Sequence, residues 1–172
     1  KAAIADTGSG RTSAPRRLIH SPFGKPQEPA PLLGLLNSQA STQPEKFAVR
    51  DSGGAALTYA MLRRAVVAGT ILLDAQGVRP GQRLALFLPR DVRVVVAPLS
   101  VMAAGGTWLA CDPDWPTARL EAMLAGAGVS FVLFADETAG AVPAGKWRRI
   151  RLPELGALTA AVMGDGPIQE RP

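Results

Sequence analysis

The residues best suited to chemistry lie in one segment, GGTWLACDPDWPTARL, at positions 105–120. An acid, Asp112, is followed at fixed offsets by Pro113, Pro116 and Arg119. Each proline fixes φ and has no backbone N–H to donate, so neither a strand nor a helix can run through this segment. The pattern predicts a rigid corner between a strand and a helix. In that corner Asp112 would accept hydrogen bonds from backbone N–H groups, with Arg119 as its candidate partner in an ion pair.

Two stretches have part of the composition of a phosphate-binding loop. Residues 8–13, GSGRTS, follow no predicted strand and open no predicted helix, which is the context that such a loop needs. Residues 144–147, AGKW, lack the hydroxyl that would hold magnesium. We therefore predict that this chain contributes no residue to a cofactor site.

The chain has a single histidine, His20, and a single cysteine, Cys111. One cysteine excludes an intrachain disulfide, and one cysteine with one histidine gives too few ligands for a Cys/His zinc site. His20 lies in the N-terminal segment, and Cys111 has no histidine near it in the sequence to act as a base. These counts predict neither a catalytic residue nor a metal ligand.

Alternating strands and helices must position the 105–120 corner. Apolar runs bounded by turn residues predict strands at 47–50, 56–57, 83–88, 107–110, 130–135 and 146–152. Helical periodicity predicts helices from 32 to just before Pro44, and at 58–76, 91–104 and 117–127, with Thr58 and Asp91 as caps and Pro98 as a kink. Ile71 is expected on the apolar face of the 58–76 helix. The alternation predicts an α/β fold, part of a doubly wound and mainly parallel sheet with helices on both faces.

Length and charge predict one domain with two flanking segments. The 172 residues, 47% of them hydrophobic, suffice for one ordinary core, which we place at 32–162. A loop is predicted at 163–172, and an extended, basic, proline-rich tail at 1–31. The formal net charge is +5, and the first 25 residues hold five basic residues against one acid, which is +4 of that total.

The tail is the candidate partner-binding segment, through Arg11, Arg16, Arg17 and Lys25. A protein partner in a larger assembly is expected, while nucleic acid and an anionic membrane surface are alternatives that charge alone does not separate. A solvated tail or a processing remnant is the simpler alternative. An arginine-rich and acid-poor start without methionine favours a mitochondrial or other organelle matrix, with the cytoplasm as the alternative. No transmembrane segment is predicted, because Arg93 and Pro98 interrupt the most apolar run.

Several motifs together resemble the opening of an adenylate-forming enzyme. They are LTYAML at 57–62, GVRPGQRLAL at 77–86, LPR at 88–90, AGG at 104–106 and DPDWP at 112–116, followed by Arg119 and Leu120. The resemblance is nearest to adenylation domains of nonribosomal peptide synthetases, then to acyl-CoA ligases, and it covers about residues 32–172. It implies a scaffolding role for Leu57, Thr58, Tyr59, Gly105, Asp112, Pro113, Pro116 and Arg119. The sequence departs from the family pattern at Met61, Ala110 and Ala118.

The resemblance implies ATP and Mg²⁺ as cofactors only for a complete enzyme. In that family the phosphate loop, the ribose-binding acid, the magnesium ligand and the mobile lysine all come after the region seen here. Two functions from different classes follow. The first is a non-catalytic accessory or structural subunit, derived from the N-terminal subdomain and held in a larger assembly. The alternative is an N-terminal fragment of an ATP-dependent carboxylate-activating ligase, revealed by a phosphate loop within about thirty residues downstream.

Overall fold

The computed structural model describes residues 31–160 and 167–169. The predicted tail, including Arg11, Arg16, Arg17 and Lys25, lies outside these residues. In chain order the elements are α1 Leu32–Thr42, β1 Phe47–Arg50, β2 Ala56–Thr58, α2 Tyr59–Ala75, β3 Arg83–Phe87, α3 Arg93–Ala103, β4 Thr107–Cys111, α4 Thr117–Gly126, β5 Phe131–Phe134, the 3₁₀ helix η1 Asp136–Ala141, β6 Arg148–Arg151 and α5 Leu155–Ala160. The predicted elements are confirmed within a few residues at their ends.

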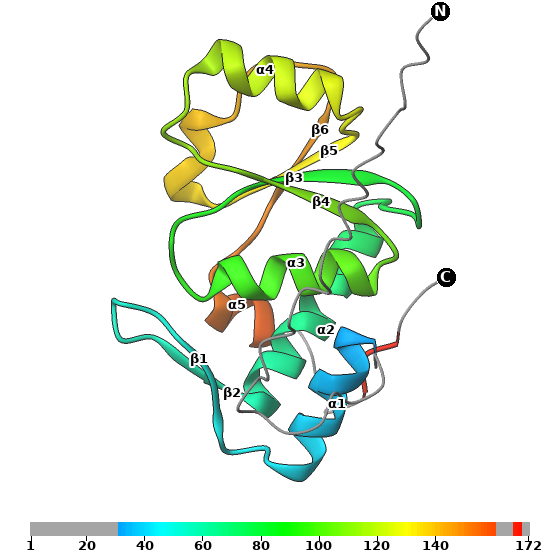
Figure 1. Cartoon of the computed structure of the whole chain (residues 1–172), viewed down its shortest axis with the longest axis vertical. Helices are drawn as coiled ribbons and strands as arrows, with labels where there is room; N and C mark the ends of the chain where they lie inside the picture. Colours follow the sequence, from blue (N-terminus) through cyan, green and yellow to red (C-terminus); the bar gives the residue numbers. More distant parts are fainter. Residues whose placement is uncertain (1–30, 161–166, 170–172) are drawn as a thin grey trace, which may run out of the picture.

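Four strands form a parallel sheet in the order β4-β3-β5-β6. Figure 1 shows α4 on one face of this sheet and α2 and α3 on the other, which confirms helices on both faces. The central strand β3 explains why two cores form. Leu84 and Leu86 belong to the core shared with α2 and α3, while Ala85 and Phe87 belong to the core beneath α4. Successive side chains of a strand point to opposite faces, so one apolar run fills both cores.

Helices α2 and α3 pack closely, and a glycine permits this approach. A Cβ atom added at Gly69 would lie 2.3 Å from Ser100 Oγ and 2.9 Å from Ser100 Cβ. The Ser100 hydroxyl, which lies against Gly69, donates a hydrogen bond to the carbonyl of Val96 in its own helix, at 2.8 Å. Pro98 lies inside α3 without ending the helix. Ile71, expected on the apolar face of α2, is 53% exposed.

The C-terminal region holds structure that the sequence pattern did not predict. Helix α5 and the 3₁₀ helix η1 are each six residues long. Ile168 falls in the predicted 163–172 loop, and residues 167–169 have no helix or strand. Its backbone N–H donates to Asn37 Oδ1 at 3.0 Å, and its carbonyl accepts from Asn37 Nδ2 at 2.9 Å. This paired contact fixes Ile168 against α1, where its side chain joins the main core.

Candidate functional site

The candidate site is the edge of the sheet where the parallel strands end. In an open α/β sheet, ligands bind beyond the carboxyl ends of the strands, at the point where successive connections leave in opposite directions. Here that point lies between β3 and β5, since the chain passes from β3 to β4 on one side and then crosses to β5 on the other. The segments that follow the strands at this edge are 88–92, 112–116, 135–141 and 152–154.

The crevice between β3 and β5 is filled by the chain itself. Thr138, in η1, is only 6% exposed. Its hydroxyl donates to the carbonyl of Phe87, the last residue of β3, at 2.5 Å. The same oxygen accepts from the backbone N–H of Ala135, just after β5, at 3.1 Å. A hydroxyl that bridges two strand ends in this way occupies the space where a ligand would sit.

A buried arginine links the segments that follow β3 and β5 at the same edge. Arg93 opens α3 and is 7% exposed. Its Nη2 lies 2.6 Å from Asp91 Oδ2 and 2.7 Å from Glu137 Oε1, and its Nε donates to Asp91 at 2.9 Å. The hydrogen bond from Arg93 is the main cause that lowers the pKa of Glu137, and the bond to Asp91 is the main cause that raises the pKa of Arg93. One guanidinium therefore faces two carboxylates, and it holds the segments that follow β3 and β5 together.

The 105–120 segment turns from strand β4 to helix α4, as its prolines predict, but the contacts of its side chains differ from those expected. Asp112 Oδ1 accepts the backbone N–H of Asp114 at 3.1 Å. Its Oδ2 accepts from Arg90 Nη2 at 3.2 Å, so the ion pair is made with Arg90 and not with Arg119. The Arg119 guanidinium instead lies over the ring of Trp115, 4.2 Å from its centroid. The expected pairing was wrong because Arg90, which follows β3, ends beside Asp112 when the two strands pair.

Pro116 directly precedes α4, and its carbonyl accepts from the N–H groups of Arg119 and Leu120 at 2.9 and 3.1 Å. Proline suits this position, because the chain there is extended and the donors that a helix leaves unpaired come after it. Pro113 lies between strand and helix, in a turn where the Trp115 N–H donates to the Asp112 carbonyl at 3.1 Å. Both prolines thus hold the corner in shape.

The other motif residues lie away from this edge. Thr58 caps α2, with its Oγ1 accepting the backbone N–H of Met61 at 3.3 Å. Leu57 is buried in the main core, and Tyr59 is half-buried against it. Gly105 has φ +75, and a Cβ atom there would lie 2.9 Å from Pro80. The structure therefore spreads the motif residues over three places and does not gather them into one pocket.

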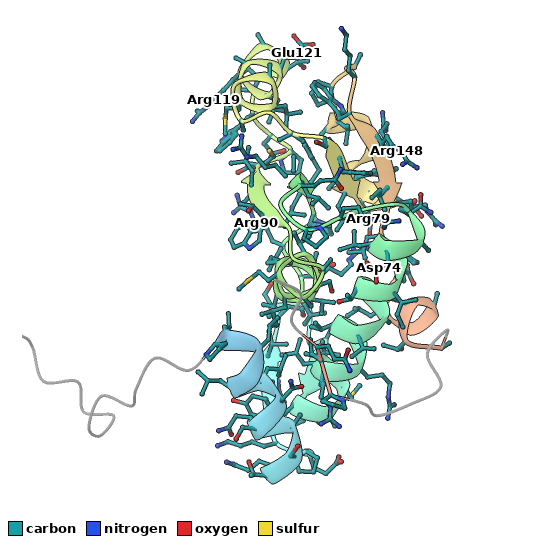
Figure 2. All side chains as sticks on the ribbon, turned by 90° about the vertical axis from the view of Figure 1, so that its right-hand side faces the viewer. Asp74, Arg79, Arg90, Arg119, Glu121 and Arg148 are labelled. Carbon is teal, nitrogen blue, oxygen red and sulfur yellow. The ribbon has the colours of Figure 1, made fainter. Side chains whose placement is uncertain are left out.

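Figure 2 shows Arg90 and Arg119 on one side of the sheet and Arg79 and Arg148 on the opposite side. The arginines at the amino ends of the strands are satisfied locally. Arg83 donates to the Ala127 carbonyl at 2.8 Å, and Arg148 lies over the Phe131 ring at 5.4 Å. Among the described residues, neither side presents a converging set of arginines of the kind that clamps a polyphosphate.

Sequence reasoning missed four residues of the carboxyl edge: Arg90, Arg93, Glu137 and Thr138. Arg93 was considered only as an interruption of an apolar run. A charged residue at the first position of an otherwise apolar helix was the available signal, because such a residue has to find a partner. The partner, Glu137, is 44 residues away in the sequence, and no pattern in the residues around it identifies it as the partner.

The described residues include neither a metal-binding cluster nor a reactive thiol. Across 31–160 and 167–169, no cluster of three His, Cys, Asp or Glu side chains could hold a metal. The carboxylates at the carboxyl edge that pair with arginines are Asp91, Asp112, Asp136 and Glu137. Burial raises the pKa of the Cys111 thiol to about 11, so it is protonated at neutral pH. Among the described helices, none combines the length and apolarity that crossing a membrane requires.

Comparison with known proteins gives consistent matches. A family model described as "AMP-binding enzyme" matches residues 36–163. The chain is 33% identical over 133 residues to a linear gramicidin synthase protein of Brevibacillus parabrevis, covering 77% of this chain and 3% of the synthase. It is 38% identical over 120 residues to the antimetabolite synthetase AmbE of Pseudomonas aeruginosa, covering 68% of this chain and 6% of that protein. This chain thus spans only a small part of these relatives.

Solved structures agree with the sequence matches. The nonribosomal peptide synthetase FmoA3 superimposes with a TM-score of 0.70 and 26% identity, over 84% of this chain and 15% of that one. The N-terminal subdomain of NpsA from Klebsiella oxytoca superimposes with a TM-score of 0.68 over 82% of this chain and 35% of the subdomain. At 16% identity the second match shows a shared fold alone.

Proposed function

Since this chain belongs to the AMP-binding enzyme family, we propose that it is the opening scaffold of an adenylation domain in an enzyme that activates a carboxylate with ATP. The part described here resembles the first portion of the N-terminal subdomain of such domains. The proposal assigns it a structural role, in which it supplies a folded layer and no reacting group.

One observation carries the structural role. At the edge of the sheet where a ligand would bind, Thr138 and the ion pairs of Arg93 with Asp91 and Glu137 link the segments that follow β3 and β5. These groups are engaged with one another, and one positive charge against two negative ones does not favour a phosphate group. We therefore assign no step of nucleotide chemistry to the described residues.

The relatives support the choice of substrate class. The matched structures include FmoA3, which is described as a nonribosomal peptide synthetase and was solved with α-methyl-L-serine-AMP bound. A matched four-domain nonribosomal peptide synthetase is described as bound to AMP and glycine. We propose by analogy that the complete domain activates the carboxylate of an amino acid. An acyl-CoA ligase, the other class that the motifs resemble, would activate a fatty or aromatic acid instead.

A stand-alone accessory subunit is the competing function. The departures at Met61, Ala110 and Ala118 are what favours it. The sequence identity of 33% to a synthase over 133 residues, and of 38% to a synthetase over 120 residues, argues against it. Three substitutions are few beside this overall similarity to enzymes. An organellar location and a partner held by the basic tail stay predictions, since they depend on residues outside the described part of the chain.

Amino-acid-dependent exchange of pyrophosphate into ATP tests the proposal. The native polypeptide that carries this sequence should catalyse exchange with at least one amino acid, while the 172-residue chain alone should show none. Exchange by the 172-residue chain would contradict the structural role. A native polypeptide that folds but shows no exchange with any amino acid or with fatty and aromatic acids would instead support the accessory role.

A further inference from the structure

An apolar groove of about 480 Å³, called here the α1–α3 groove, lies between helices α1, α2 and α3 and strand β4. Twelve residues line it, and none of them is charged. Several large apolar side chains on its walls are open to solvent: Leu32 is 53% exposed, Val94 45% and Trp108 42%. Exposed apolar surface that is gathered in one hollow marks a site of contact with another apolar surface.

Helix α3 has the composition of a helix covered on all sides. Its sequence, RVVVAPLSVMA, has two polar residues, Arg93 and Ser100, and both are buried. A helix that is apolar around its whole circumference lies inside a protein. One side of α3 does face the sheet and α2, and Figure 1 shows α1 on the far side of α3 from the sheet. The Val94 side faces solvent, so one covering layer is present and a second is missing.

The two edge strands of the sheet differ in charge, and the uncharged edge lies beside the groove. Strand β6, at one edge, carries three arginines in RRIR, and charged residues of this kind block the addition of another strand. Strand β4, at the other edge, reads TWLAC, with no charge and no proline. Within the described strands it pairs with β3 alone. Trp108 belongs both to this open edge and to the groove, so the two form one continuous surface.

We propose that this surface, the α1–α3 groove with the β4 edge, is covered by the remaining part of the same N-terminal subdomain. This inference rests on the proposed function. The chain matches 35% of the length of a solved N-terminal subdomain, so a complete subdomain has about twice as much further polypeptide available. The uncharged lining fits an apolar layer of such polypeptide, and it does not fit nucleic acid or an acidic protein, which need basic contacts.

Single cysteines report whether the groove is covered. The substitutions Val94→Cys and Trp108→Cys lie in the groove, and Met61→Cys is a matched control, because Met61 is also 45% exposed but lies outside it. The native Cys111 is buried and gives the unreactive baseline. Each variant is made in the 172-residue chain and in the native polypeptide, and the rate of reaction with a maleimide is measured together with circular dichroism to establish folding.

In the 172-residue chain at low concentration, all three cysteines should react at similar rates. In the native polypeptide, Val94→Cys and Trp108→Cys should react at least about tenfold more slowly, because a covered thiol reacts only through local opening. Met61→Cys should react equally in both forms.

Three results would overturn the inference. The groove cysteines could react equally fast in the two forms. They could be protected in the 172-residue chain as its concentration rises, which would identify a second copy as the occupant. A fatty acid could protect them there, which would identify a ligand pocket. Pyrophosphate exchange on the same samples separates the two proposals. If the native polypeptide catalyses exchange but its groove cysteines react freely, this inference alone is wrong. If the groove cysteines are protected but no exchange is detected, the proposed function alone is wrong.

Discussion

At the scale of single residues, the ion pairs of Arg93 explain how the carboxyl edge is held. Arg93 is buried, whereas Glu137 is about half exposed, so water screens part of their attraction. The guanidinium would be left in the interior with one fewer acceptor if Glu137 were neutral. The pair therefore contributes to stability chiefly by satisfying a buried charge.

Replacing Glu137 with glutamine should lower the free energy of unfolding by about 1 kcal/mol at pH 7. The pKa of Glu137 is lower in the folded than in the unfolded state, so its contribution is fully present above the unfolded pKa and is lost as pH falls through the folded value. The difference between wild type and variant should thus shrink below about pH 4. Urea unfolding from pH 3 to 7 measures it.

Asp136→Asn is the matched control, since Asp136 pairs with Arg151 and both side chains are 61% exposed. Its loss of stability at pH 7 should be smaller than that of Glu137→Gln, because water screens an exposed ion pair. An equal loss in both variants would show that Glu137 has no special link to the buried arginine.

The residues of the carboxyl edge could be predicted from the sequence only in part. The 105–120 corner and the Thr58 cap were predictable, because both depend on neighbours within a few positions. Glu137 and Thr138 were not, because their partners lie 44 and 51 residues away. Asp112 was expected to pair with Arg119 seven positions on, but strand pairing places Arg90 beside it instead.

At the scale of elements, the contact between α2 and α3 depends on Gly69. Gly69→Ala should lower the free energy of unfolding by about 1 to 3 kcal/mol, because the added methyl group would overlap Ser100 and push the helices apart. Chemical denaturation measures this loss.

Gly34→Ala is the control in another helix. Nothing lies within 4 Å of a Cβ atom at Gly34, so alanine there should raise stability by about 0.5 to 1 kcal/mol through its better helix propensity. A gain of stability in Gly69→Ala as well would show that the two helices are not held as closely as described.

Prediction of elements succeeded where the sequence signal is long or strongly apolar. Strand β3 reads RLALF and β5 reads FVLF, and such buried parallel strands are continuous apolar runs. The six-residue elements η1 and α5 were missed, because two turns or fewer give no measurable periodicity. Ile71 was assigned to the apolar face of α2 by its type, yet the helix turns it to solvent.

At the scale of the whole molecule, the chain is a layered α/β unit with one apolar surface left open. The fold class followed from the alternation of strands and helices. The α1–α3 groove did not, since it arises from three helices and a strand that meet only in three dimensions. Family membership and partial coverage of every compared relative give the open surface a simple explanation, which is that a longer domain continues over it.

The proposed role is that this chain stabilises an active adenylation domain without taking part in its chemistry. The most direct test is pyrophosphate exchange by the native polypeptide with and without Glu137→Gln, at a temperature well below the melting of both. We predict a lower melting temperature for the variant and an unchanged kcat/KM for the amino acid and for ATP. A loss of kcat/KM of about a hundredfold or more, the size expected when a group that stabilises a transition state is removed, with melting unchanged, would contradict the account.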